Sequence, residues 1–117
     1  MDENQTIAAL AALAQPTRLQ SFRLLVAAEP TGVAAGALAE TLDIPQNTMS
    51  AHLATLSRAG LVTSTRDGRS IIYRANLEGL RATMLFLVRD CCGGNAALCA
   101  PLIEDLAPCY APAEKCR

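Results

Sequence analysis

The sequence predicts a mainly α-helical fold with one two-stranded β-hairpin, in the order α-α-α-α-β-β-α. Apolar residues recur at helical spacing before Gly60 and again after Leu77, whereas short strand-like runs lie between these points with Asp67-Gly68 among them. The chain has 117 residues, of which 51% are hydrophobic but only 3% aromatic, so closely packed helices suit it better than a large sheet. We expect residues 1–99 to form one domain and residues 100–117 to form an irregular tail.

Two helices are expected near the start of the chain. The first covers Thr6–Ala14, and the second begins at Pro16, because the missing N–H of proline has no intrahelical partner in a first turn. Arg18 and Arg23 of the second helix are expected to face water. The apolar stripes expected on the two helices are Ile7, Leu10, Ala11 and Ala14, and then Leu19, Phe22, Leu25 and Val26.

A short helix, a tight turn and a longer helix follow. The short helix is expected over Val33–Leu42, the turn over Asp43–Pro45, and the longer helix over Gln46–Ala59 with Gly60 as a left-handed cap. The inner face of the longer helix is expected to carry Met49, Leu53 and Leu56. Its outer face is left with Gln46, Asn47, Ser50, Ala51 and Thr55.

The period of the pattern then changes. Leu61–Arg66 and Ser70–Ala75 are predicted to be the strands of a hairpin, with Asp67-Gly68 between them. A long helix is expected from Leu77 to about Cys92, ended by Gly93-Gly94. Its apolar side is expected to carry Leu80, Met84, Leu87 and Val88.

This order of elements is that of a winged helix-turn-helix, and it predicts binding to double-stranded DNA. The turn sets the longer helix at a steep angle, so that its polar N-terminal face can enter a major groove about 12 Å wide. Arginines near the hairpin tip can contact phosphates or the minor groove. The alternative is a polar face that is only solvated and a hairpin that only packs. The candidate DNA-contacting residues are Gln46, Asn47, Thr48, Ser50, His52, Arg66, Arg69 and Arg74.

The charge of the chain is distributed unevenly. Its formal net charge is −1, which argues against an indiscriminate nucleic-acid coat. Between Gln46 and Arg74, however, four arginines accompany a single aspartate. The positive charge is therefore concentrated where DNA contact is expected.

Several classes of protein fit poorly. The apolar runs are too short to span a bilayer, and the polar, acidic start of the chain is unlike a signal peptide, so we expect a cytoplasmic protein. The single histidine, His52, lies in the expected DNA-reading helix, although a catalytic cysteine would need a base. We expect neither an enzyme nor an organic cofactor.

Several segments in combination resemble the ArsR/SmtB family of metalloregulatory repressors. They are Ala12–Leu19, Leu38–Glu40, Ser50–Val62, Asp67–Arg69 and Tyr73-Arg74. The resemblance covers roughly Thr6 to Cys92. It implies a homodimer, paired through the first and last helices, on pseudo-palindromic operator DNA.

Pro45 departs from the family pattern, and His52 matches it. Pro45 stands where the family commonly has serine, which removes a hydroxyl that could contact phosphate. His52 falls within the family's Ser-x-His-Leu pattern. It is either a DNA contact or a packing residue beside Met49 and Leu56.

All five cysteines, Cys91, Cys92, Cys99, Cys109 and Cys116, lie near the end of the chain. Their odd number and the lack of an export signal favour metal binding or thiol chemistry over a disulfide framework. Gly93-Gly94 lets the chain reverse and bring Cys99 toward Cys91 and Cys92. Three thiolates suit a soft ion, and As(III) and Sb(III) bind three sulfurs without a fourth ligand. The sequence therefore predicts As(III) or Sb(III) as inducer of a DNA-binding repressor.

Other chemistry stays open. Zinc or cadmium would want four ligands, with Cys109 or Cys116 as possible additional ones. Thiol oxidation, unconnected reduced cysteines and a metal-independent interaction domain are further alternatives. The Cys-x-Cys that many family members carry near the recognition helix is absent from Val26–Ala37, so the vicinal pair resembles that of arsenic-responsive members with a relocated site. The Gly-Gly loop favours a site within one chain over a site that bridges two.

Overall fold

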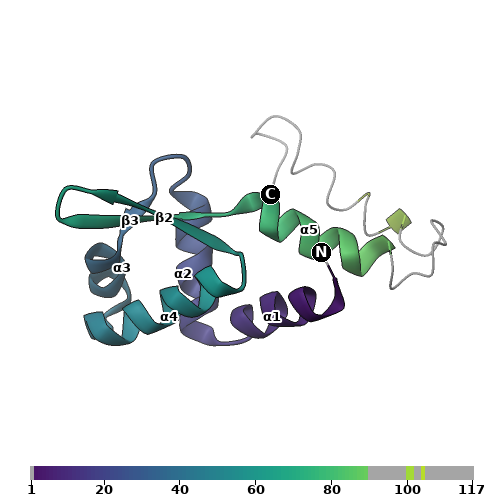
Figure 1. The fold of residues 1–117 in the computed structure, drawn as a ribbon, viewed down its shortest axis with the longest axis horizontal. Helices are drawn as coiled ribbons and strands as arrows, with labels where there is room; N and C mark the ends of the chain where they lie inside the picture. Colours follow the sequence, from purple (N-terminus) through teal and green to yellow (C-terminus); the bar gives the residue numbers. More distant parts are fainter. Residues whose placement is uncertain (1, 90–99, 102–103, 105–117) are drawn as a thin grey trace. The chain divides into compact units, whose positions relative to one another are not determined.

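The computed structural model describes residues 2–89, 100–101 and 104. The helices of this part are α1 (Glu3–Leu13), α2 (Pro16–Ala27), α3 (Ala35–Leu42), α4 (Gln46–Arg58) and α5 (Leu77–Arg89), and the strands are β1 (Val33–Ala34), β2 (Val62–Asp67) and β3 (Ser70–Ala75) (Figure 1). Residues 1–83 form one compact unit and residues 84–117 another. The predicted mainly α-helical fold with a hairpin is confirmed. The predicted end of the domain at residue 99 and the end of the last helix near Cys92 lie outside the described residues.

The sheet has one strand more than the sequence predicted. Val33 and Ala34, expected to open the short helix, instead pair antiparallel with Tyr73 and Ile72 of β3, so the strand order is β1-β3-β2. The short helix α3 begins only at Ala35. The local sequence gives no sign of this pairing, because the partner strand lies about forty residues further along the chain.

Helix α1 begins earlier than expected, at Glu3 instead of Thr6. The cause is a capping box: the Asp2 carboxylate accepts a hydrogen bond from the Gln5 N–H at 2.7 Å, and the Gln5 side chain accepts one from the Asp2 N–H at 2.8 Å. The reciprocal bonds satisfy N–H groups that the first helical turn leaves without partners.

The apolar stripe predicted for α1 is wrong, because all four of its residues are exposed, whereas the stripe predicted for α2 divides between core and surface. The buried residues of α1 are Thr6, Ala9 and Ala12, whereas Ile7 and Leu10 of the predicted stripe are 56% and 41% exposed. In α2 the predicted Phe22 and Leu25 are buried, but Leu19 and Val26 are exposed. The single chain therefore leaves large apolar side chains of its first two helices in contact with water.

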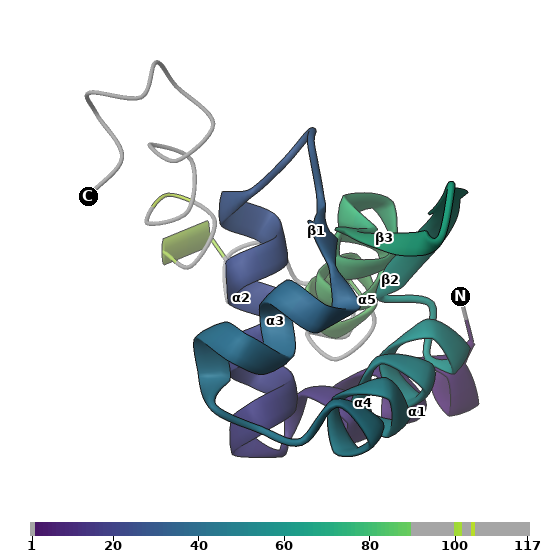
Figure 2. The same cartoon turned by 90° about the vertical axis from the view of Figure 1, so that its left-hand side faces the viewer.

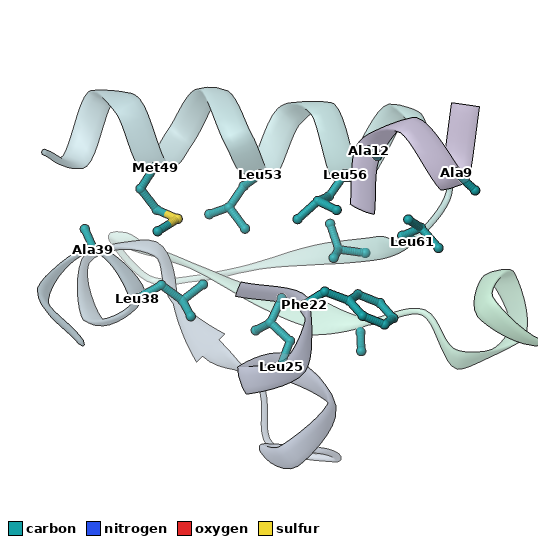
Figure 3. Packing of buried hydrophobic residues seen from close by; sticks show 12 residues of the cluster. Ala9, Ala12, Phe22, Leu25, Leu38, Ala39, Met49, Leu53, Leu56 and Leu61 are labelled. Carbon is teal, nitrogen blue, oxygen red and sulfur yellow. The ribbon is translucent and has the colours of Figure 1, made fainter. Parts of the chain in front are cut away.

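Helix α4 lies against the centre of the core. Its inner face carries Met49, Leu53 and Leu56, as predicted, and all three are fully buried. Figure 3 shows these side chains pointing from one side of α4 toward Leu38 of α3 and Phe22 of α2. The opposite side of α4 is thereby fixed as the outer surface.

The hairpin loop is displaced by one residue from the prediction. Asp67 pairs with Ser70, so Gly68 and Arg69 form the two-residue loop, and Gly68 takes the positive φ of 63° that such a turn needs. Strand β2 correspondingly runs over Val62–Asp67 instead of Leu61–Arg66. The shift places Arg69 in the loop itself.

Hydrogen bonds connect the start of α5 to the residues that follow α4. Gly60 follows α4 with a φ of 79°, in the left-handed conformation predicted for it. The Asn76 N–H donates to the Leu61 carbonyl at 2.8 Å, its side-chain amide donates to the Gly60 carbonyl at 2.8 Å, and its Oδ1 accepts from the Gly79 N–H at 3.3 Å. A Cβ on Gly79 would overlap the Gly60 carbonyl oxygen. This α4–α5 joint, formed by Gly60, Leu61, Asn76 and Gly79, sets the position at which α5 begins.

Gly32 provides a test of the β1–β3 packing. Its φ is 82°, and a Cβ there would lie 2.7 Å from both the Arg74 Cγ and the Tyr73 carbonyl oxygen. We expect Gly32→Ala to lower the free energy of unfolding by about 3 kcal/mol, from the left-handed backbone and the displaced neighbours together. Gly68→Ala is the matched control, because its φ is also positive but a Cβ there meets nothing within 4 Å, and it should cost about 1 kcal/mol. Urea unfolding measures both values, and equal losses would contradict the close approach at Gly32.

Candidate nucleic-acid interface

The turn between α3 and α4 fixes the direction of α4. Asp43 adopts the left-handed conformation, with φ and ψ both 54°, and ends α3. The Ile44 N–H then donates to the Ala39 carbonyl at 2.9 Å, and Pro45 stands immediately before α4 as expected. This is the predicted tight turn, and it presents the first turn of α4 outward.

The outer surface at the start of α4 is short and uncharged. We call Gln46, Asn47, Thr48 and Ser50 the reading face, because all four are exposed whereas Met49 between them is buried. Pro45 offers no side-chain cap, but the Asn47 Oδ1 accepts a hydrogen bond from the Thr48 N–H at 2.9 Å. Short polar side chains and the partial positive charge of a helix N-terminus allow close approach to DNA.

The wing, which is the β2–β3 hairpin, carries two arginines on the same side of the fold as this face (Figure 1). Arg66 near the end of β2 and Arg69 in the loop are both exposed. Figure 1 shows the tip of the wing and the N-terminal end of α4 directed to the same side, and Figure 2 is viewed from that side. A duplex that meets the reading face can thus meet the cations of the wing as well.

Arg74 has a different environment from the other wing arginines. Its Nε donates to the Glu29 carboxylate at 2.8 Å, and its Nη2 donates to the other carboxylate oxygen at 3.3 Å. The hydrogen bond and the negative charge of Glu29 raise the pKa of Arg74 above its ordinary value. A paired guanidinium adds less net charge to the surface than Arg66 or Arg69 does. A DNA contact by Arg74 stays a prediction.

His52 contacts a residue that the sequence did not suggest. It is half-buried on α4, and its Nδ1 lies 3.4 Å from the Nη1 of Arg18. Arg18, expected to face water, is itself half-buried and donates through Nε to the Ala12 carbonyl at 2.7 Å. The sequence offered one clue to the role of Arg18. The residue lies in Ala12–Leu19, a segment that carries the family resemblance.

Two further residues matter that sequence reasoning missed. Glu29, the partner of Arg74, lies 45 positions away in the chain, and Asn76 reaches back to Gly60. Periodicity marks neither, because both are polar residues at the ends of elements. Only a fold that brings those ends together gives them partners.

The five cysteines that the sequence offers as ion ligands lie near the end of the chain. Cys91, Cys92, Cys99, Cys109 and Cys116 all lie outside the described residues. Among the residues that the structure describes, no three histidine, cysteine, aspartate or glutamate side chains gather as a metal site. The predicted As(III) or Sb(III) ligands therefore stay a sequence-based expectation.

Comparison with known proteins agrees with this geometry. A family described as a helix-turn-helix domain matches residues 13–65. Transcriptional activator HlyU from Vibrio cholerae is 30% identical over 97 residues, which cover 81% of this chain and 87% of that protein. An ArsR-like transcriptional regulator from Rhodococcus sp. RHA1 has a TM-score of 0.69 and 29% identity over 86% of this chain and 92% of that one. The chain belongs to the ArsR family of transcriptional regulators.

Two other solved structures are similar to this chain. The homodimeric winged helix-turn-helix DNA-binding domain of Mb0332 from Mycobacterium bovis has a TM-score of 0.61 and 31% identity, over 73% of this chain and 77% of that one. A protein described as a possible transcriptional regulator for arsenical resistance has a TM-score of 0.59 and 34% identity, over 65% of this chain and 76% of that one.

The family establishes the class of activity. These relatives are transcriptional regulators, so the chain is a regulator with a winged helix-turn-helix and not an enzyme. No helix in the described part of the chain is long and apolar enough to cross a membrane.

The salt dependence of DNA binding tests the wing. Arg66→Ala and Arg69→Ala should each weaken binding to any duplex and lower the slope of log K against log salt by about one, because one phosphate contact is lost. Arg74→Ala should change the slope less, because Glu29 already neutralises that charge. Exposed Arg23 of α2 is the control, and Arg23→Ala should leave the slope unchanged. Fluorescence anisotropy over a salt series measures these slopes. A full unit lost in Arg74→Ala would instead make Arg74 a phosphate contact.

Proposed function

We propose that the protein is a repressor that binds operator DNA as a homodimer and is released when As(III) or Sb(III) binds the thiolates of Cys91, Cys92 and Cys99. The observation that carries DNA binding is the exposed, uncharged reading face at the start of α4, with the exposed wing arginines Arg66 and Arg69 on the same side of the fold. The inner face of α4 packs in the core, so the reading face on its outer side does not take part in core packing.

Pairing of two copies is supported by the surface of α1. Ile7 and Leu10 are large apolar side chains that the single chain leaves exposed on one helix. Burying apolar surface of this kind is a common basis of homodimer formation. The Mycobacterium bovis relative is described as homodimeric. Because the reading face is uncharged and the net charge of the chain is −1, two linked copies would provide the affinity that one lacks.

The inducer is proposed from the chemistry of the cysteines. Three thiols lie within nine residues, and Gly93-Gly94 stands between the vicinal pair and Cys99. This set matches the three-sulfur preference of As(III) and Sb(III). One relative is described as a possible regulator for arsenical resistance, which supports the same assignment. The alternatives from the sequence, zinc or cadmium and thiol oxidation, are arms of the experiment below.

The route from the cysteines to the DNA runs through α5. Cys91 follows Arg89, the end of the described helix, by two residues, and the other end of α5 is held by the α4–α5 joint. A change at the cysteine end of α5 would therefore be felt at the end of the recognition helix. A coupling free energy of about 1–3 kcal/mol, or roughly 5–150-fold in affinity, would be enough for regulation. By linkage, DNA must weaken binding of As(III) by the same factor.

The first experiment measures binding to the DNA upstream of the protein's own gene, with and without arsenite. A non-thiol reductant keeps the cysteines reduced without competing for As(III). Arsenite should lower the affinity of the natural protein, whereas Cys91→Ser, Cys92→Ser and Cys99→Ser should bind DNA normally and lose the response. Cys109→Ser and Cys116→Ser are matched controls that should keep it. A normal response from Cys99→Ser would remove the three-sulfur site.

Parallel arms separate the alternatives. Release by zinc or cadmium, with loss of the response in Cys109→Ser or Cys116→Ser, would replace arsenic by a four-ligand metal. Release by an oxidant that a reductant reverses would replace it by thiol oxidation. A transcriptional reporter is needed to distinguish repression from activation, because the relative HlyU is named as an activator. Arsenite should raise transcription from the reporter, and a fall would contradict repression.

The α4–α5 joint gives a separate prediction. Asn76→Ala removes its side-chain hydrogen bonds to Gly60 and Gly79 but leaves the reading face untouched. We expect DNA affinity without arsenite to stay within a few-fold of the natural protein. The arsenite effect should shrink by at least half on a logarithmic scale, because part of the 1–3 kcal/mol coupling is lost. Anisotropy titrations with and without arsenite measure both quantities. An unchanged arsenite effect would exclude the joint from the route.

A further inference from the structure

The side chain of Arg18 joins three helices. It belongs to the first turn of α2, and its Nε donates to the Ala12 carbonyl in the last turn of α1 at 2.7 Å. Its Nη2 lies 3.5 Å from the Ala11 carbonyl, and its Nη1 lies 3.4 Å from the Nδ1 of His52 on α4. One planar cation is therefore shared by the end of α1 and the middle of the recognition helix.

The α1 end of this contact has a clear electrostatic reason. The last carbonyls of a helix lack intrahelical partners and carry partial negative charge, which a cation stabilises. The last turn of α1 has no basic residue of its own. Arg18 supplies both the missing donor and the missing positive charge from the following helix.

At its α4 end the guanidinium meets the imidazole of His52. Arginine has only donors, so a hydrogen bond between the two side chains uses the Nδ1 of His52 as the acceptor. The ring is thereby held toward α1 and α2 by a polar contact. This differs from both sequence-based interpretations, in which His52 contacts DNA or packs beside Met49 and Leu56.

We propose that Arg18 is a positioning residue for DNA recognition, which sets the angle of α4 relative to α1 by holding His52 and the end of α1 together. The proposal rests on DNA binding by α4 and is independent of the arsenic response. Gln46 lies six residues before His52, or about 9 Å along the helix, so a tilt of roughly 10° at His52 moves it by about 1.5 Å. Polar recognition tolerates about 0.5 Å. A small loosening at Arg18 would thus misplace the reading face.

The position of α1 makes the contact relevant to pairing as well. Ile7 and Leu10 are exposed on the same helix whose C-terminal carbonyls Arg18 binds. If two copies meet there, Arg18 links the helix that pairs to the helix that reads DNA. The separation of the two reading faces would then depend on this contact.

The rival role is a direct DNA contact by Arg18 or His52. Charge and shape separate the two roles, because a phosphate contact contributes about one unit to the salt slope, whereas a positioning residue contributes none. A positioning role for His52 also requires only an acceptor where Nδ1 lies. Asparagine offers its Oδ1 at a similar distance from the backbone, and leucine offers no acceptor.

The test uses Arg18→Gln, His52→Leu, His52→Asn and the double variant Arg18→Gln/His52→Leu, with Arg23→Gln as the control on α2. Arg18→Gln and His52→Leu should each weaken operator binding about tenfold, the size expected for a lost hydrogen bond to a charged group, with an unchanged salt slope. His52→Asn should bind within about threefold of the natural protein. The double variant should be no weaker than the worse single variant, because both remove one contact.

Three results would overturn the proposal. A salt slope lowered by about one in Arg18→Gln would make Arg18 a phosphate contact, and equal losses in His52→Asn and His52→Leu would make the ring itself a DNA contact. Additive losses in the double variant would show that the two residues act separately. Circular dichroism and sedimentation show whether each variant is folded and paired. Should Arg18→Gln unfold, the His52→Asn and His52→Leu pair decides the question by itself.

Discussion

Burial of one face of α4 is the constraint on which the rest of the structure depends. Met49, Leu53 and Leu56 fill the centre of the core, so the rotation of α4 about its own axis is fixed by packing. Rotating the helix would expose leucine and methionine and bury amide and hydroxyl groups that have no partners there. The uncharged surface that starts at Gln46 therefore faces outward because the opposite face is occupied. The same packing that stabilises the domain orients its reading face.

Packing fixes the rotation of α4 about its axis. The left-handed turn before α4 and polar contacts with neighbouring helices fix its direction. The left-handed Asp43 directs the N-terminal end, and Asn76 holds the C-terminal end through the Gly60 carbonyl. In the middle, His52 meets the guanidinium of Arg18. These contacts join α4 to α3, to α5 and, through Arg18, to α2 and α1, so a movement of any of these helices has a physical path to α4. A small regulator of this kind can respond to a distant event without a large rearrangement.

The charges of the wing suit the positioning of the protein on DNA better than a strong electrostatic attraction to DNA. Of the wing arginines, Arg66 and Arg69 are exposed, whereas Arg74 is paired with Glu29. The Glu29 pair also holds the loop before β1 against β3, next to Gly32, where a side chain has no room. A modest positive surface on a chain with a net charge of −1 limits nonspecific attachment to DNA. Specific binding must then depend on the shape of the reading face.

The sequence by itself determined the order of the helices, the hairpin, and the inner and outer faces of α4, because these follow from local periodicity and from residues such as Pro16 and Gly60 with strong conformational preferences. It also defined the cysteine cluster, whose chemistry depends on residue type and spacing. Only the tertiary structure decided that Val33 joins β3, that Ile7 of the α1 stripe is exposed, and that Arg18 turns inward. These features depend on partners far away in the chain. A pattern read along one segment shows which residues are apolar or charged, but not which of its faces another segment will cover.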